Sequence, residues 1–167
     1  RMKNIVAVPS VQEQFKNAMG ENSQLFTASL IELYSGDNYL QNCEPKDVVM
    51  EALKAASLKL PINKGLGFAW IVPRRIQGKY MPGMQIGWRG WVQLAQRSGK
   101  YKYINAGCIY EGEDVVEDRM SGAITIVGKP SSRTVTGYFG YFQLTSGFEK
   151  SVYWSKDKVV AHMEHYV

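Results

Sequence analysis

Apolar positions in the first sixty residues recur at the three- and four-residue spacing that is typical of an α-helix facing a core. Ser10 is expected to cap the first helix, with Glu13 completing a capping box and Gly20 ending it. Pro45 stands near the start of the third, where proline is tolerated. The pattern therefore predicts a helical N-terminal part, with helices over residues 8–20, 21–36 and 43–58.

After Pro61 the pattern changes to alternation, with many β-branched and aromatic residues, which indicates strands. A helical pattern returns at 88–98, and Ser155 is placed to cap a closing helix. Thr145 to Gly147 form a natural hairpin turn. The strands are expected over 65–73, 84–87, 100–112 and 122–128 and as a pair within 134–154, with a loop at 74–83. This order predicts an α+β fold: a helical N-terminal part, a mainly antiparallel sheet with an inserted helix, a β-hairpin and a C-terminal helix.

The length of 167 residues and the hydrophobic content of 45% allow one sizeable core, so a single domain over 1–167 is expected. No apolar run approaches the length of a membrane span, and no leader is evident. Cys43 and Cys108 stand far apart and are expected to be buried thiols, which fits a reducing cytoplasm. Because the chain starts at Arg1 and stops inside a predicted helix, we expect it to be the ordered core of a longer protein.

Charge is divided unevenly along the chain. Residues 52–110 contain ten basic residues and no acid, a charge of +10, whereas the rest carries ten basic against fifteen acidic residues, a charge of −5. A surface selected only for solubility mixes both signs, so a block of one sign indicates a polyanionic partner.

The stretch IGWRGWVQLAQRSGKYK, residues 86 to 102, lies in the second half of this block. On a helical wheel Trp88 and Trp91 fall on the apolar face, and Arg89, Gln93 and Arg97 fall on the opposite face. The apolar face favours core packing for the two tryptophans, with contact to a nucleic-acid base or backbone as the alternative. The opposite face is expected to contact phosphate.

Cations, amides and flat rings are the groups that single-stranded nucleic acid uses, for phosphate neutralisation, hydrogen bonding and stacking. Lys54 and Lys59 stand near the C-terminal end of a predicted helix, where a positive charge is favourable for the helix dipole, so they are left out of the candidate DNA-binding residues. The candidate DNA-binding residues are Arg74, Arg75 and Lys79 on the expected loop, Trp88, Arg89, Gln93 and Arg97 on the helix, and Lys100, Lys102 and Tyr103 at the start of the next strand.

Groups that would form a reaction centre are not evident in the sequence. There is no phosphate-binding loop, and the serines lack a partner histidine in a nucleophile motif. The acids of EGEDVVED (111–118) are interpreted as a solvated turn, with a metal site as the alternative; His162 and His165 lack an identifiable third ligand. We expect a binding protein without catalytic residues, metal or cofactor.

Two segments carry a resemblance: LPINKGLGFAWIVPRR (60–75) and MQIGWRGWVQLAQRSGKYKYINAGCIYEGE (84–113). Together they resemble the RecT family of phage and prophage single-strand annealing proteins. The acidic run 111–118 departs from the family in lacking an aromatic residue. The family motif falls on Gln85, Gly87, Gly90, Leu94, Arg97, Ser98 and Gly99, which adds Gln85 to the candidate DNA-binding residues.

The resemblance implies an ATP-independent recombinase that coats single-stranded DNA, pairs it with a complement and holds the annealed duplex in a ring or helical filament. It also implies a partner exonuclease, a host single-strand-binding protein and action in a bacterial host cell. Because pairing must read the base edges, such a protein is expected to bind the DNA backbone, here also through the N–H groups of Gly87 and Gly90. The alternatives are a non-polymerising single-strand-binding accessory protein and a nuclease that uses the acids at 111–118.

Overall fold

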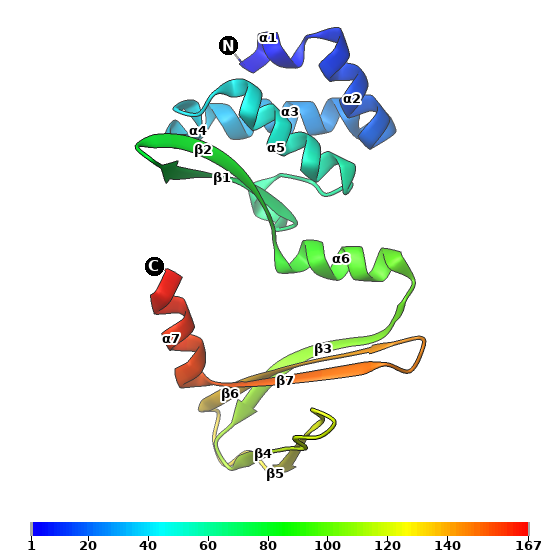
Figure 1. The fold of residues 1–167 in the computed structure, drawn as a ribbon, viewed down its shortest axis with the longest axis vertical. Coiled ribbons are helices and arrows are strands. Elements are labelled where there is room, and N and C mark those ends of the chain that lie inside the picture. The colour runs from blue at the N-terminus through cyan, green and yellow to red at the C-terminus, as the bar shows by residue number, and fades with distance from the viewer. Residues whose placement is uncertain (1, 167) are drawn as a thin grey trace. The chain divides into compact units, whose positions relative to one another are not determined.

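The computed structural model describes residues 2–166, and they form two compact units that meet in sequence between Leu94 and Ala95 (Figure 1). That residues 1–167 form one DNA-annealing domain stays a prediction.

None of the described helices is both long and apolar enough to cross a membrane. Unit 1 contains α1 (Met2–Val6), α2 (Pro9–Met19), η1 (Gly20–Asn22), α3 (Ser23–Ser35), α4 (Asn38–Gln41), α5 (Pro45–Ser57), η2 (Lys64–Leu66), β1 (Ala69–Ile76), β2 (Lys79–Ile86) and most of α6 (Trp88–Ser98). Unit 2 contains the end of α6, then β3 (Tyr101–Tyr110), β4 (Glu113–Glu117), β5 (Ile124–Gly128), β6 (Val135–Leu144), β7 (Glu149–Ser155) and α7 (Lys156–Tyr166).

The three predicted N-terminal helices are confirmed as α2, α3 and α5, and the predicted inserted helix is confirmed as α6. The short helices α1 and α4 were not predicted, because four or five residues are too few to display a helical period. The prediction that Ser10 caps this helix is wrong. Pro9 occupies the first turn with its φ already fixed, so α2 begins before Ser10 and Val8 is its N-cap residue, without a side-chain hydrogen bond.

The core of unit 1 is formed where α2, α3 and α5 pack together. Phe15, Leu30 and Val48, one from each helix, are fully buried. Leu60 and Ile62, on the segment that leads to β1, are buried in the same cluster. The β1–β2 hairpin is attached to this helical layer, and the Glu51 side chain on α5 accepts a hydrogen bond of 2.8 Å from the Met84 N–H on β2.

The segment predicted as a loop, 74–83, is instead the distal half of the β1–β2 hairpin, so that prediction is wrong. Gln77 and Gly78 form a two-residue turn with φ of 48° and 82°, the left-handed conformation that such hairpin turns require. Pro73 and Pro82 stand opposite each other in the register. A two-stranded hairpin has unpaired edges, where a residue without an N–H is tolerated, and this is why two prolines did not prevent strand pairing.

Unit 2 contains two antiparallel sheets, β3-β6-β7 and β4-β5, followed by α7. The predicted strands at 100–112, 122–128 and 134–154 are confirmed, as is the turn at Thr145 to Gly147. The Ser155 hydroxyl accepts a 3.3 Å hydrogen bond from the Lys158 N–H, which confirms the predicted cap of α7. The α+β fold is therefore confirmed, with its strands divided among three small antiparallel sheets.

Aromatic rings lie close to two glycines in the three-stranded sheet. A Cβ at Gly107 would stand 2.7 Å from the Phe139 ring, and one at Gly137 would stand 2.5 Å from the Tyr153 ring. Glycine at these positions lets the rings lie flat on the neighbouring strand. Of the two cysteines, Cys43 is buried as predicted, whereas Cys108 in this sheet is half-buried.

Candidate nucleic-acid interface

Two glycines hold the first turn of α6 against the segment that precedes β1. The Gly87 N–H donates a 2.9 Å hydrogen bond to the Phe68 carbonyl. A Cβ at Gly87 would lie 2.3 Å from the Gly67 carbonyl oxygen, and one at Gly90 would lie 2.2 Å from that of Phe68. The backbone is therefore in close contact with its neighbour, and the prediction that the Gly87 N–H serves the DNA backbone is wrong, because that donor is already used.

This docking decides which side of α6 faces the core. Gly90 is buried and Leu94 packs against the core cluster of unit 1. Trp88 and Trp91 point outward, with 69% and 61% of their surface exposed. The prediction that both indoles pack in the core is wrong, because a glycine lets the helix approach through its backbone and turns the tryptophan face away.

Arg89 is placed beside one of these rings. Its guanidinium carbon lies 5.3 Å from the centroid of the Trp88 ring, within the range of a cation–π contact. One of its nitrogens, Nη1, donates a 3.2 Å hydrogen bond to the Leu66 carbonyl. The residue remains exposed, so the arginine is oriented by unit 1 and is still accessible from solvent.

The other two candidates on the polar face of α6 differ from each other. Arg97 is exposed in the last turn, as predicted. Gln93 is half-buried, and its Oε1 atom is buried without a hydrogen-bond partner among residues 2–166. The face predicted to contact phosphate is therefore exposed at Arg89 and Arg97 but only partly at Gln93, which lies beside Leu94, a residue of the packed side.

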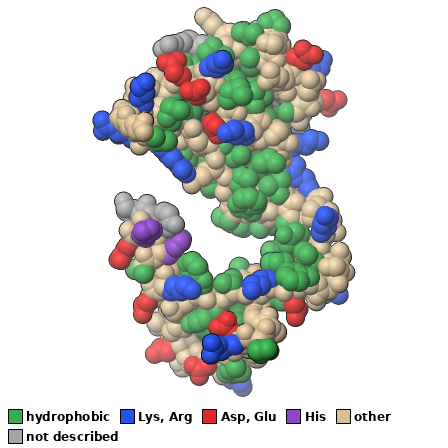
Figure 2. Space-filling model, in the orientation of Figure 1, with side chains coloured by type: hydrophobic (Ala, Val, Ile, Leu, Met, Phe, Trp, Pro, Cys, Tyr) green, Lys and Arg blue, Asp and Glu red, His purple; other side chains and the backbone are tan. Residues whose placement is uncertain are grey.

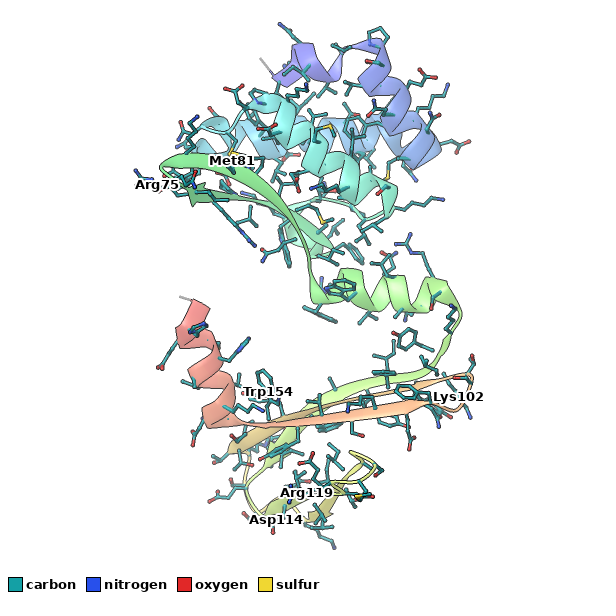
Figure 3. All side chains as sticks on the ribbon, in the orientation of Figure 1. Arg75, Met81, Lys102, Asp114, Arg119 and Trp154 are labelled. Atoms are coloured by element: carbon teal, nitrogen blue, oxygen red, sulfur yellow. The ribbon has the colours of Figure 1, made fainter. Side chains whose placement is uncertain are left out.

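The candidates of the expected loop lie around the hairpin turn. Arg74 and Arg75 on β1 and Lys79 on β2 are exposed. Figure 2 shows lysine and arginine side chains gathered at this end of the hairpin, and Figure 3 labels Arg75 there beside Met81 of β2. We define these three cations as the hairpin-tip cluster. At about 3.4 Å per residue, Arg74 lies about 17 Å and Lys79 about 24 Å along its strand from the base of the hairpin.

Gln85 lies at the opposite end of the hairpin. It is exposed on β2 opposite Trp70, three residues before Trp88. The structure thus places Gln85, Trp88 and Arg89 in one neighbourhood at the base of the hairpin and the hairpin-tip cluster at its far end. Unit 1 contains two separate groups of candidate residues.

Ion pairs within unit 1 show where the positive charge is uncompensated. Lys64 pairs with Asp37 at 3.3 Å, and Lys54 pairs with Glu51, so two cations of the acid-free segment are neutralised by acids outside it. This agrees with leaving Lys54 out of the candidate set. In the described part of the chain, by contrast, no carboxylate pairs with the hairpin-tip cluster or with Arg89.

In unit 2 the remaining candidates lie at the start of β3. Lys100, Lys102 and Tyr103 are all exposed. The Lys102 ammonium stands 5.5 Å from the Tyr103 ring centroid, and Figure 3 labels Lys102 at this end of the sheet. A cation and an aromatic ring are thus combined here as they are at Arg89 and Trp88.

Residues 24–166 match the RecT family. The chain belongs to the RecT family. It is 40% identical over 166 residues to the uncharacterized protein YqaK of Bacillus subtilis (strain 168), covering 99% of this chain and 57% of that protein. It is 30% identical over 79 residues to Protein RecT of Escherichia coli (strain K12), covering 45% of this chain and 29% of that protein. The chain therefore spans little more than half the length of its Bacillus relative.

In this RecT-family chain three of the acids at 111–118 have hydrogen-bond partners. The predicted turn covers only residues 111–112, because residues 113–117 are strand β4, paired with β5, but all of these acids except Glu113 are exposed to solvent, as predicted. Glu113 accepts a hydrogen bond from the Tyr110 N–H, Glu111 accepts one from the Ser132 hydroxyl, and Asp118 accepts two within its own turn. Among residues 2–166 no three His, Cys, Asp or Glu side chains are grouped closely enough to hold a metal ion.

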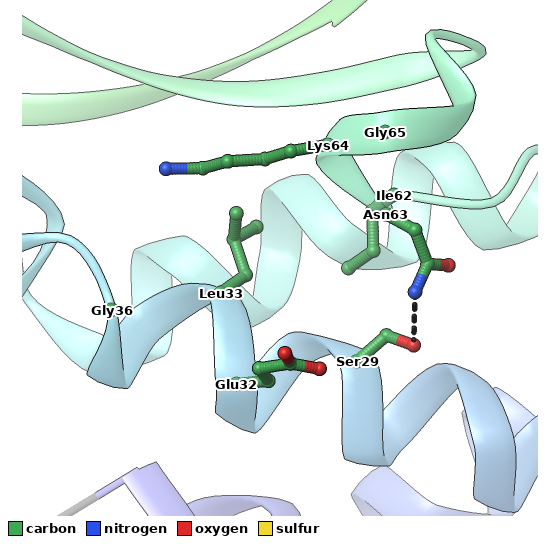
Figure 4. Close-up of a pocket in the computed structure, with 8 residues that line it drawn as sticks. All are labelled: Ser29, Glu32, Leu33, Gly36, Ile62, Asn63, Lys64 and Gly65. Atoms are coloured by element: carbon green, nitrogen blue, oxygen red, sulfur yellow. Dashed lines mark hydrogen bonds between the residues drawn. The ribbon is translucent and has the colours of Figure 1, made fainter.

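A pocket of about 410 Å³ lies elsewhere in unit 1 of the RecT-family chain, between α3 and the segment 62–65 (Figure 4). Two of its polar side chains already have partners: Asn63 donates to the Ser29 hydroxyl at 3.0 Å, and that hydroxyl donates to the Leu25 carbonyl at 3.0 Å. Its cation, Lys64, is paired with Asp37. None of the candidate DNA-binding residues lines this pocket.

Proposed function

We propose that this chain is the DNA-annealing part of an ATP-independent single-strand annealing protein of phage-type homologous recombination. RecT family membership supports annealing in recombination as the role. The observation that carries the binding proposal is the uncompensated positive charge of the hairpin-tip cluster and Arg89, in a segment of 59 residues without an acid.

Annealing requires that the protein bind DNA without recognising its base sequence. Lysine and arginine contacts to phosphates supply sequence-independent affinity, and complementary base pairing supplies the specificity. In the proposal Arg74, Arg75, Lys79, Arg89, Arg97, Lys100 and Lys102 contact phosphates, with Gln85, Gln93, Trp88 and Tyr103 as the polar and aromatic contacts. No residue has a catalytic role in this proposal, and no cofactor is required.

Repetition of the subunit explains how a small chain acts on long DNA. Each copy contributes a few phosphate contacts, and copies linked in a ring or helical filament bind the strand with an affinity that one copy lacks. The same assembly then holds the annealed duplex. A cognate exonuclease that exposes the strand and a host single-strand-binding protein, in the bacterial cytoplasm, complete the proposed setting.

The test is mass photometry of the full chain alone, with one oligonucleotide, and after addition of the complementary strand, without ATP. The proposal expects large assemblies on the first strand that persist or grow when the complement arrives. A small complex of constant mass that dissociates on addition of the complement contradicts annealing and identifies a non-polymerising single-strand-binding accessory protein. Loss of full-length DNA only when magnesium is present identifies a nuclease.

A further inference from the structure

Trp88 and Trp91 form an exposed aromatic surface on α6, which we call the indole ridge. They stand one helical turn apart, about 4.5 Å along the helix axis, and each exposes more than 60% of its surface. Residues three apart are neighbours on a helix surface, and a contiguous exposed apolar surface rimmed by polar residues marks an interaction site.

The contacts of α6 keep this ridge outward. Gly90 is in close contact with the Phe68 carbonyl, and Leu94 packs against the core of unit 1. Turning the indoles inward would require the helix to rotate away from both contacts and would break the hydrogen bond between Gly87 and Phe68. The ridge is therefore fixed by unit 1, and its rings are presented to a partner without prior rearrangement.

The surroundings of the ridge indicate the chemistry of that partner. The Arg89 guanidinium lies 5.3 Å from the Trp88 ring, and the sequence has no carboxylate between residues 52 and 110. A nucleotide combines a flat ring with a phosphate anion a few ångströms away, which matches an indole beside a guanidinium. A second protein chain would bury the arginine charge against the ridge and would need an acid of its own to compensate it.

We infer that bases of single-stranded DNA stack on the faces of Trp88 and Trp91 while Arg89 contacts the adjoining phosphate. This inference rests on the proposed function and adds Trp91 to its binding residues. Stacking engages the faces of the bases and leaves their hydrogen-bonding edges free. A complementary strand can therefore pair with a base that is still held on the ridge, which phosphate contacts alone do not position.

The experiment compares a fluorescent oligothymidylate with an abasic oligonucleotide of the same length and phosphate charge, by anisotropy at several salt concentrations. Removing a stacking ring costs about 5- to 150-fold in affinity. We expect Trp91→Ala to lose that much for oligothymidylate, to bind the abasic strand unchanged and to keep the salt slope. Trp91→Tyr, which retains a ring, is expected to restore most of the loss. The matched control is Leu25→Ala on α3, an equally exposed apolar side chain at 70%.

The outcomes separate the two proposals. An equal loss on both oligonucleotides, or no loss on either, overturns stacking while leaving DNA binding intact. A Trp91→Ala chain with a smaller mass in the absence of DNA, and an unchanged preference for base-bearing DNA, assigns the ridge to a protein contact and also overturns stacking. Failure of the unmodified chain to bind either strand refutes the proposed function itself. Circular dichroism of each variant shows that it is folded.

Discussion

Gly90 lies so close to the backbone of Phe68 that a Cβ atom at residue 90 would stand 2.2 Å from the Phe68 carbonyl oxygen. Within a helix, alanine is ordinarily more favourable than glycine by about 1 kcal/mol. Here the added methyl must displace backbone, so we expect Gly90→Ala to lower the free energy of unfolding by about 1–3 kcal/mol, as measured by urea denaturation.

Gly65 supplies the control for this prediction. It lies in η2 of the same unit, and a Cβ there would meet nothing within 4 Å. Gly65→Ala should therefore leave the denaturation midpoint nearly unchanged. If Gly90→Ala proves as stable as Gly65→Ala, α6 does not depend on the close backbone contact described above.

Asp37 links the cap of α4 to an ion pair and should make stability depend on pH. Partial burial acts to raise the pKa of its carboxyl, but the N–H groups of Leu40 and Tyr39 and the Lys64 ammonium outweigh it, so the pKa lies below its ordinary value. A lowered pKa in the folded state means that the carboxylate stabilises the protein above its unfolded pKa of about 3.9. This stabilisation is lost as the pH falls through the folded value.

Asp37→Asn keeps an oxygen for the cap and removes the charge. We expect it to be less stable than the unmodified chain by about 0.5–1 kcal/mol at pH 7, with the difference disappearing as the pH is lowered below 4. Thermal unfolding at a series of pH values measures this. Two stability curves that run parallel from pH 7 to pH 3 would show that the Asp37 charge is not involved.

The hairpin-tip cluster and Lys54 should differ in their effect on DNA binding. Each phosphate contact to single-stranded DNA contributes about 0.7 to the slope of log affinity against log salt concentration. Replacing Arg75 and Lys79 together by glutamine should reduce that slope by about 1.4. Lys54→Gln should leave it unchanged, because Glu51 already neutralises this lysine. Equal slopes in the two variants would remove the hairpin tip from the interface.

Gln93 carries a buried acceptor that costs free energy. Its Oε1 has no partner in the described residues, and an unsatisfied buried polar group destabilises a protein by about 1–3 kcal/mol. Methionine has a similar shape without the amide, so Gln93→Met should raise the free energy of unfolding by about 1 kcal/mol. DNA affinity measured on the same variant shows whether the amide is kept for binding. A fall in stability would mean that the oxygen does have a partner in the folded protein.

Helical periodicity predicted α2, α3, α5 and α6, and alternation rich in β-branched and aromatic residues predicted the strands of the three-stranded sheet. The distal part of the β1–β2 hairpin was missed because proline and glycine were interpreted as loop residues. Strand β4 was missed for a different reason. Its sequence, EDVVE, has acids on both faces of a ribbon that buries little, so alternation was not visible.

The tryptophans of α6 show what a helical wheel omits. The wheel separates apolar from polar residues, and it places Trp88 and Trp91 on the side that would normally be buried. Glycine has no side chain, so a helical wheel counts it as neither apolar nor polar. Gly87 and Gly90 nevertheless determine which side of α6 approaches the core, because only glycine permits such close backbone contact. Two glycines three residues apart at the start of an amphipathic helix were the available signal. With it, the exposure of the indoles could have been predicted.

The order of the strands in unit 2 also sets the order in which the chain can fold during its synthesis. Strands β4 and β5, like β6 and β7, pair with a neighbour in sequence, whereas β3 pairs with β6, which follows only after residues 111–134. At 5–20 residues per second, residues 111–144 take roughly 2–7 s to emerge from the ribosome. During this interval β3 presents unpaired backbone and exposed apolar side chains. It is therefore the segment of the nascent chain most open to pairing with a wrong strand.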